Sequence, residues 1–380
     1  MPETRSRIVH RLLPPLAVFL LVRAVLLAAS LQVGADTFDK GTWIQWDSHF
    51  YLQIARSGHE LFPCSVHSRG SKQGWCGNTG WMPGYPYLLR VLAKTGLSLE
   101  TAAVALSTAC AFLVLLLLWV FFLGHDPTPR NLAALTAAGF FPGFVFLHAA
   151  FPLSLELVFL LLATACLVRK RFLLAGLAGA AAAFIYTSGA LFAVVAAGWL
   201  TIRLLKGELS FPAWVRGLLL ASGLTVAGLG LVFVIHWQTT DHWDALFKIQ
   251  SQYVQGVHNP FSTFLRKISR VFRWPYRFKT GISWQTLLVA VFSLWCLVRQ
   301  AARPGEITDR NAALLLYLLA YWLSPLFAGP GLNIYRSEVL LLPAVALLGG
   351  GRVQVTAAFA AGFLAIGYSL CVVFFRGLLL

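Results

Sequence analysis

Thr101-Ala-Ala-Val-Ala-Leu-Ser-Thr-Ala-Cys-Ala-Phe-Leu-Val-Leu-Leu-Leu-Leu-Trp-Val-Phe-Phe-Leu123 contains no charged side chain. The hydrocarbon core of a bilayer is about 30 Å thick, and a helix crosses it with about 20 apolar residues. This stretch is therefore long enough to span a membrane as one helix. Similar apolar runs lie at 12–31, 131–150, 154–168, 172–187, 189–205, 217–236, 283–299, 312–328, 337–350 and 354–375.

The composition of the whole chain is also typical of a membrane protein. Hydrophobic residues make up 58% of the chain and charged residues 12%, whereas a soluble domain carries about 25% charged residues. Backbone in lipid must satisfy its own hydrogen bonds, which leaves helices or closed barrels, and the period-two pattern of barrel strands is absent. We therefore expect an all-α polytopic membrane protein, a single domain over 1–380 with about 11 transmembrane helices.

The chain is strongly basic, with 30 Lys and Arg against 14 Asp and Glu and a net charge of +16. Most of these bases flank apolar runs, where they act as topology signals and contact anionic membrane lipids. This placement argues against a nucleic-acid partner. The loops rich in bases are expected on the cytoplasmic side, and they include Arg130, Arg169, Arg203, Arg299 and Arg352. Residues 32–100 and 237–282 then form two large extracytoplasmic loops.

Two of the six cysteines, Cys64 and Cys76, lie in a polar stretch of the first loop. If that loop faces an oxidising compartment, we expect a disulfide between them. The alternative is two free thiols. The other four cysteines lie in apolar runs and are expected to be small buried hydrophobic residues.

The first loop also holds the most informative residue, Asp47, in the stretch Trp46-Asp47-Ser-His49. The aromatic spacing predicts a helix over 43–59 that lies along the membrane surface. A carboxylate beside aromatic rings just outside a bilayer is costly unless it is paired or used. Partly desolvated, it can act as a general base that takes a proton from an attacking hydroxyl. The alternative is an acid that caps the helix or pairs with Arg56 or His49.

The helical pattern is interrupted in three places. Phe151-Pro152 and the stretch 186–189 each split a pair of apolar runs, and irregular backbone at membrane depth is tolerated only against protein or water. These two breaks either line a cavity or are ordinary turns at the bilayer surface. The third, 80–90, contains two prolines and two glycines and predicts a rigid extended turn.

Two further charged residues lie near the outer ends of apolar runs. Glu156 is either a buried hydrogen-bond anchor or a second active-site carboxylate. In the second case it would position an acceptor, hold a divalent cation with Asp47, or pair with Arg336. Arg336 is a candidate for binding a phosphate, unless Glu338 neutralises it.

The second large loop contains a basic amphipathic segment. Its bases recur at a spacing of three and four residues, and they include Arg266, Lys267, Arg270 and Arg273. Guanidinium groups bind phosphate well. The segment is therefore either a clamp for the phosphate of a lipid-linked leaving group or a general attachment to anionic lipid.

Motifs of nucleotide-driven pumps and of soluble nucleotide-sugar enzymes are missing from the sequence, as are metal-type CxxC pairs. If a group is transferred, we expect a lipid-linked phosphate donor. No dedicated metal cage is visible, although a divalent cation, Mg or Mn, would be compatible with the site.

Several stretches together resemble the PIG-V-like mannosyltransferases, of the GPI mannosyltransferase 2 type. The first is Trp46-Asp47-Ser-His49-Phe-Tyr51, continuing to Ile54-Ala55 and Gly58-His59. The others follow in the family's order, and they are Met82-Pro83-Gly84-Tyr85-Pro86, Ser154-Leu-Glu156, Asp241 to Gln250 with Pro260, and Tyr335-Arg336 before Leu342-Pro343. His59, the stretch 185–189 and the order Tyr335-Arg336 depart from the family pattern, which leaves the acceptor and the sugar open.

The resemblance implies a GT-C-type glycosyltransferase that uses a polyprenyl-phosphate sugar in an inverting single displacement. It implies that Asp47 is the catalytic base. We expect the donor phosphate to be bound by Arg266, Lys267, Arg270, Arg273 and Arg336. We expect the sugar donor and a lipid-linked or glycan acceptor to contact Trp46, His49, Tyr51, Glu156 and Gln250.

The expected location is the bacterial cytoplasmic membrane, or the ER membrane in a eukaryote, with the active site on the extracytoplasmic side. The main alternative is a transporter or lipid flippase without covalent chemistry. It predicts acids at mid-membrane and inverted repeats, neither of which is evident. A non-catalytic assembly subunit is a third possibility, and it predicts that loss of Asp47 is tolerated.

Overall fold

The computed structural model describes residues 2–66, 74–252, 256–269, 271, 278–329 and 334–379. In these ranges the chain is almost wholly helical, and one two-stranded sheet, β1 (Leu61–Pro63) with β2 (Trp75–Gly77), is the exception. Seven helices among the described residues are long and apolar enough to cross a membrane, namely His10–Leu31, Leu99–Phe121, Thr187–Leu205, Phe211–Thr240, Thr280–Ala301, Asp309–Ala328 and Val353–Phe375. The prediction of an all-α integral membrane protein is confirmed.

The helices vary in length from one turn to eight. In chain order they are α1 (Pro2–Leu31), η1 (Lys40–Trp43), α2 (Ser48–Ser57), η2 (Cys64–Val66), α3 (Gly84–Ala93), α4 (Leu99–Phe121), α5 (Pro129–Gly139), α6 (Val145–His148), α7 (Leu153–Val168), α8 (Phe172–Ile185), η3 (Thr187–Leu191), α9 (Phe192–Leu205), α10 (Phe211–Gly217), η4 (Leu218–Gly223), α11 (Leu224–Thr240), α12 (Ala245–Gln250), α13 (Pro260–Ile268), α14 (Phe278–Ala301), η5 (Pro304–Glu306), α15 (Asp309–Ala328), α16 (Ile334–Ser337), η6 (Glu338–Gly350) and α17 (Val353–Phe375).

Side-chain caps fix where several helices begin. Ser98 accepts a hydrogen bond from the third backbone N–H of α4, and Thr128 and Thr308 do the same for α5 and α15. Such caps satisfy backbone donors that have no partner inside the helix, and each contributes about 1 kcal/mol. The beginning of each of these helices is therefore set by its own sequence.

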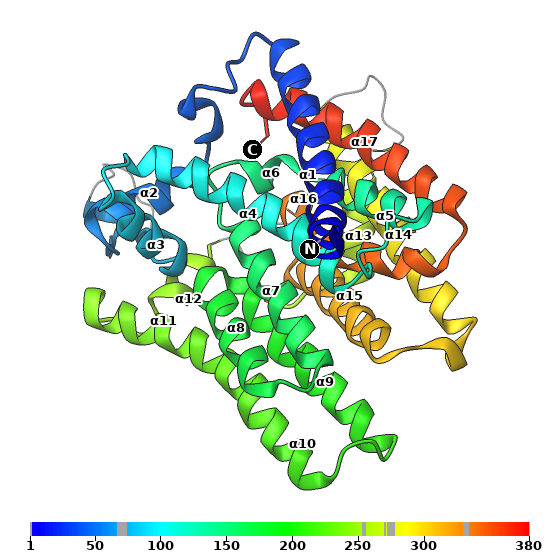
Figure 1. Ribbon diagram of the computed structural model, residues 1–380. Helices are drawn as coiled ribbons and strands as arrows, with labels where there is room; N and C mark the ends of the chain where they lie inside the picture. The colour runs from blue at the N-terminus through cyan, green and yellow to red at the C-terminus, as the bar shows by residue number, and fades with distance from the viewer. Residues whose placement is uncertain are drawn as a thin grey trace.

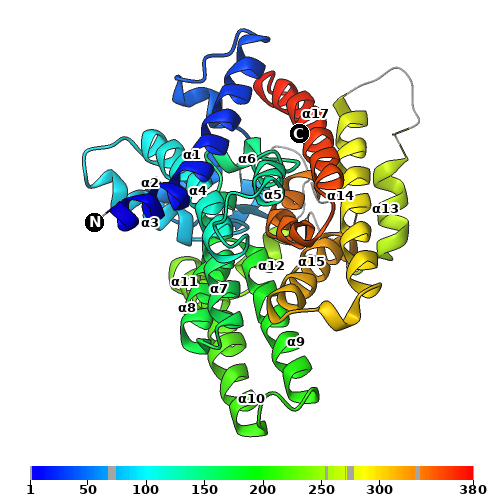
Figure 2. The same cartoon turned by 45° about the vertical axis from the view of Figure 1, so that its right-hand side comes forward.

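The long apolar helices and the shorter α7 and α8 pack in a continuous series. α8 lies between α11 and α7, α7 packs on α4, α4 on α1, α1 on α17, and α17 on α14. Figures 1 and 2 show α9 and α10 extending away from α1 and α17, so the two groups form opposite ends of the molecule. α10, the π-helical turn η4 and α11 together form one uninterrupted helix, which we call the α10–α11 rod.

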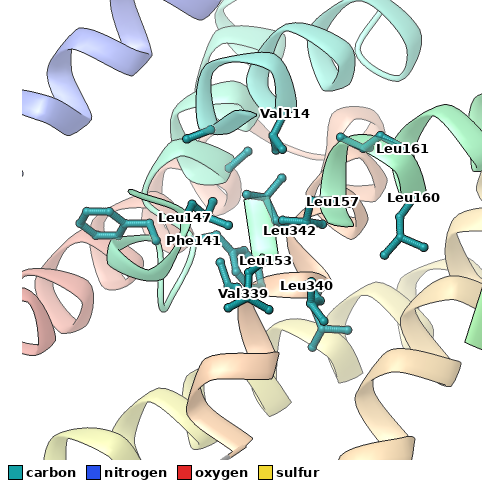
Figure 3. Close-up of a cluster of buried hydrophobic side chains, with 14 of the residues drawn as sticks. Val114, Phe141, Leu147, Leu153, Leu157, Leu160, Leu161, Val339, Leu340 and Leu342 are labelled. Atoms are coloured by element: carbon teal, nitrogen blue, oxygen red, sulfur yellow. The ribbon is translucent and has the colours of Figure 1, made fainter. Parts of the chain in front are cut away.

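The centre of the molecule is a buried apolar cluster where α4, α7 and η6 meet (Figure 3). The side chains drawn there come mainly from these three elements and from the α5–α6 region, and they are buried. They include Val114, Leu157, Leu160, Val339 and Leu342. Because η6 lies at this centre, its backbone is surrounded by protein, which is the condition for irregular backbone at membrane depth.

The structure differs from the expected spans in three places. The expected run 131–150 is divided into α5 and α6, with Pro142 and Gly143 at the break. The run 337–350 is a 3-10 helix rather than an α-helix, and Pro343 lies inside it. The runs 154–168 and 172–187 correspond to the shorter helices α7 and α8. Proline removes a backbone donor and clashes with the preceding turn, so apolar content alone overestimates continuous α-helix.

The expected extended turn at 80–90 is limited to 80–83, where the backbone turns and bends. Helix α3 begins at Gly84, and Pro86 lies in its first turn, where its missing N–H is not needed. A Cβ at position 84 would lie 2.7 Å from the carbonyl oxygen of Phe184. Gly84 is thus required by the close approach of α3 to the end of α8 rather than by a turn.

Residues of the two long loops lie against each other. Thr79 Oγ1 donates to the carbonyl of Ala245 at 3.0 Å, and Gln250 Nε2 donates to the carbonyl of Gly80 at 2.9 Å. The β1–β2 hairpin pairs Phe62 with Cys76. The predicted disulfide between Cys64 and Cys76 is confirmed, and it closes the hairpin.

Candidate functional site

Asp47 follows a strained turn. The expected helix over 43–59 is shorter, because η1 ends at Trp43 and α2 begins at Ser48. Between them Trp46 has φ +47°, a left-handed conformation that is uncommon for a bulky residue. Its ring is held edge-to-face against Phe374, with 5.5 Å between ring centroids. Such conformations cost about 1–3 kcal/mol and persist where the surroundings enforce them, often at functional sites.

The carboxylate of Asp47 pairs with Arg336. Oδ2 of Asp47 lies 2.5 Å from Nη1 of Arg336, although the two residues are 289 positions apart in the sequence. The Arg336 side chain is only 10% exposed, whereas that of Asp47 is 36% exposed. The guanidinium therefore belongs to the protein interior, and the carboxylate remains accessible from outside.

Three aromatic rings surround the Arg336 guanidinium. Its central carbon lies 5.6 Å from the Trp46 ring centroid, 5.7 Å from that of Phe151 and 5.8 Å from that of Tyr335. Burial is the largest single influence on the pKa of Arg336 and lowers it, but the charges of Tyr335, Asp47 and Tyr186 and a hydrogen bond with Tyr335 together raise it, so the net shift is upward. The group therefore stays a cation held among ring faces, which attract positive charge.

The other partners considered for these two residues are engaged elsewhere. Asp47 occupies the N-cap position of α2, but its side chain makes no capping hydrogen bond. Arg56 pairs with Glu100, and His49 is exposed on α2. Glu338 accepts a hydrogen bond from Gln285 Nε2 at 2.7 Å. Of the alternatives weighed from the sequence, an ion-paired Asp47 is observed, but with Arg336 as its partner.

Glu156 lies fully buried in the first turn of α7. Its Oε1 accepts a hydrogen bond from Ser188 Oγ at 2.6 Å. Its Oε2 is buried and has no hydrogen-bond partner among the described residues. A buried carboxylate oxygen left without a donor is costly, so this oxygen is suited to receive a donor from a ligand.

Tyr51 lies within electrostatic range of both carboxylates. It is buried on α2, with its ring edge-to-face against Tyr85 at 5.6 Å. Burial raises the pKa of Tyr51 well above its usual range, and the charges of Tyr186, Asp47 and Glu156 add to this shift. Both carboxylates therefore lie close enough to act on the phenol. Asp47, Arg336, Tyr51 and Glu156, which we call the Asp47–Arg336 site, form one polar group inside an otherwise apolar fold.

The two helix breaks that the sequence revealed both border this site. Phe151, at the first break, places its ring beside Arg336, and Ser188, at the second, bonds Glu156. Sequence reasoning missed Ser188 and Gln285 as contributors. Gln285 Nε2 donates to the carbonyl of Tyr335 at 2.7 Å as well as to Glu338, and it thereby anchors the segment that carries Arg336. The sequence did contain one signal for Gln285, because a polar amide lies there inside an apolar run.

The remaining expected site residues lie elsewhere or outside the described residues. Gln250 fastens α12 to the first loop. Arg266 is exposed on α13, and the charge of Lys267 acts on Glu338. Arg270 and Arg273 fall outside the described residues. No group of three or more His, Cys, Asp or Glu suited to a metal ion occurs among the residues that were described.

The chain was also compared with known proteins. No protein-family model and no curated protein matches it. What the molecule does must therefore be inferred from the chemistry of the Asp47–Arg336 site.

Proposed function

We propose that the protein is a GT-C-type glycosyltransferase, most closely a mannosyltransferase. It would transfer a sugar from a polyprenyl-phosphate donor to a hydroxyl of a lipid-linked or extracytoplasmic acceptor. The observation that carries this proposal is the contact between an accessible Asp47 carboxylate and a buried Arg336 guanidinium. The reaction needs a base for a hydroxyl and a cation for a phosphate, and these are the two groups that meet.

The chemistry follows from these two groups. The acceptor hydroxyl forms a bond to the anomeric carbon of the sugar while its proton passes to Asp47. The bond from that carbon to the donor phosphate breaks, and the electron pair leaves with the phosphate. Arg336 stabilises the charge that develops on the phosphate, since guanidinium groups bind phosphate oxygens strongly.

The ion pair itself provides an order of events. While Arg336 holds Asp47, its guanidinium occupies Oδ2 of the carboxylate. An entering donor phosphate competes for the same guanidinium. Release from Arg336 then frees Asp47 Oδ2 to accept the hydroxyl proton at the time the electrophile is in place. Donor binding therefore prepares the base.

The neighbouring polar groups suit a sugar. Glu156 Oε2 and the Tyr51 hydroxyl can accept and donate hydrogen bonds to sugar hydroxyls. The Trp46 ring lies next to the base and can stack on a sugar face. Gln250 would act indirectly, because it holds the two loops together. His49, exposed on α2, would meet the acceptor at the rim of the site.

We also propose how the protein is arranged in its membrane. The loops 32–100 and 237–282 face the extracytoplasmic side, and about eleven crossings are counted when the short helices and η6 are included. The resident membrane is the bacterial cytoplasmic membrane. If the reaction uses a divalent cation, Asp47 would be the residue to hold it, and the ion would supply positive charge near the donor phosphate.

The proposal is tested with purified protein in lipid nanodiscs, radiolabelled polyprenyl-phosphate mannose and a lipid extract as acceptor. We expect labelled product from the native protein and a loss of about 100-fold or more for Asp47→Asn, since general bases contribute about 10²–10⁴-fold. Arg336→Lys should mainly raise the KM for the donor, because an ammonium cannot form a bidentate phosphate contact.

Asp126→Asn serves as the matched control, since Asp126 is an exposed acid far along the chain from the site. It should turn over like the native protein. Native-like turnover by Asp47→Asn would disprove the base assignment. Movement of intact labelled donor across the bilayer without sugar transfer would instead support the transporter alternative.

A further inference from the structure

A groove on the membrane-facing side of the molecule is separate from the Asp47–Arg336 site. It has a volume of about 750 Å³ and lies between α1 and α4, in front of η1. Leu16 and Phe19 line it from α1. The residues that line it from α4 share one helix face, and they are Thr101, Val104, Ala105, Thr108, Ala109 and Phe112.

The groove is graded in polarity. Asp39, Lys40 and Thr101 lie at one end, and apolar side chains follow down to Phe112 and Leu16. The distance along α4 from Thr101 to Phe112 is about 17 Å at about 1.5 Å per residue. This is close to half of the about 30 Å hydrocarbon core. The groove therefore has the length of one leaflet, with its polar end at the surface.

The wall nearest the Asp47 loop is rigid. Trp43 is 1% exposed, and its Nε1 donates to the carbonyl of Thr37 at 2.9 Å. The Arg23 guanidinium carbon lies 5.3 Å from the Trp43 ring centroid. Beside the mouth, Phe38 is 88% exposed, which is costly in water and favourable among lipid chains.

We infer that this groove binds one phospholipid with a zwitterionic headgroup that carries a phosphate and an ammonium, as in phosphatidylethanolamine. One acyl chain lies between α1 and α4. The inference is independent of the proposed transferase activity.

Charge complementarity at the mouth selects this headgroup. Lys40 Nζ lies 3.3 Å from Ser98 Oγ, which fixes a cation at the start of α4. Asp39 Oδ1 accepts from the backbone N–H of Gly41 at 3.0 Å, which fixes an acid beside it. A phosphate would face Lys40 and an ammonium would face Asp39. A purely anionic headgroup would place its charge next to Asp39 as well and be repelled.

Native mass spectrometry of the full chain measures this binding. Protein stripped of lipid in detergent is titrated with phosphatidylethanolamine, phosphatidylglycerol and polyprenyl phosphate, and the first bound lipid is quantified. We expect one saturable site that prefers phosphatidylethanolamine. Equal binding of all three would show annular lipid only and overturn the inference, and preference for either anionic lipid would overturn the assigned headgroup.

Variants of the two charged residues test whether the mouth of the groove binds the lipid headgroup. Lys40→Gln and Asp39→Asn should each weaken phosphatidylethanolamine binding roughly twofold to fivefold, the range for exposed charge pairs. Both are mild changes, because Gln can still reach Ser98 and Asn still caps Gly41. Lys94→Gln removes an exposed base that follows the end of α3 and is the control. Unchanged selectivity in both mouth variants would contradict the headgroup assignment.

A variant that fills the groove with a larger side chain tests whether an acyl chain binds there. Ala105 is exposed on the groove face of α4, so Ala105→Trp occupies the groove without entering the core. We expect the saturable lipid to be lost, with binding weakened roughly tenfold or more, because several buried methylene groups lose their contacts. Ala361→Trp places the same ring on an exposed position of α17 and should bind lipid normally. Retention of the lipid by Ala105→Trp would place it elsewhere.

Discussion

At the scale of single residues, the two members of the ion pair differ in how they are held. Arg336 lies among three aromatic rings, and Gln285 anchors its segment through the carbonyl of Tyr335. Asp47 follows the left-handed turn at Trp46, and its side chain is 36% exposed. A fixed guanidinium next to a carboxylate that can change partners is the arrangement expected where a substrate competes for the cation.

A second residue, His59, should make the stability of the protein depend on pH. Burial lowers the pKa of His59 to about 3, and the facing His236 ring, 4.8 Å away between centroids, adds to this. The unfolded chain takes up a proton near pH 6.5, but the folded site does not. Stability is therefore full above about pH 6.5 and falls as the pH drops toward 3.

The measurement is the melting temperature in detergent between pH 7.5 and 4.5. We expect the native protein to lose stability on acidification and His59→Gln to lose less, since Gln carries no titrating group. His49→Gln changes an exposed histidine and should follow the native curve. Identical pH dependence for His59→Gln and the native protein would contradict the assignment.

At the scale of elements, the close contact of α3 with the end of α8 depends on Gly84. A Cβ there would lie 2.7 Å from the carbonyl oxygen and 2.9 Å from Ile185 Cα, both on backbone that cannot rotate away. Gly84→Ala should destabilise the protein by about 1–3 kcal/mol, the cost of overpacking, and lower its melting temperature. Gly230→Ala on α11 is the control, because nothing lies within 4 Å of its Cβ position. It should be neutral or slightly stabilising, and equal effects of the two changes would refute the packing argument.

Some of these elements could be predicted from the sequence and others could not. Apolar length and composition predicted the spanning helices, and cysteine spacing in a polar loop predicted the disulfide. Asp47 stood out because an acid among aromatic residues is costly. Its partner could not be predicted, since nothing local relates position 47 to position 336. The 3-10 form of η6 was equally hidden, because an apolar run does not specify which helix it forms.

At the scale of the whole molecule, the contacts of Thr79 and Gln250 join the two long loops. We therefore expect both on one side of the membrane, and the distribution of Lys and Arg places that side outside. Thr95→Cys, exposed before α4, should react with a membrane-impermeant maleimide on intact cells. Lys206→Cys, exposed after α9, should react only after permeabilisation, and the parent protein sets the background. The reverse labelling pattern would invert the orientation.

The length of the α10–α11 rod has a consequence for how the protein sits in its membrane. Its 30 residues extend about 45 Å, which exceeds the about 30 Å of hydrocarbon available. The rod must tilt, or one of its ends must extend into the headgroup region. A thicker membrane would reduce the difference between the length of the rod and the thickness of the hydrocarbon core. His236, near that end, touches His59 at the base of the disulfide-closed hairpin. A change in the acyl-chain length of the host bilayer should change the tilt of the rod and thereby move the hairpin. The position of the hairpin should therefore depend on membrane thickness.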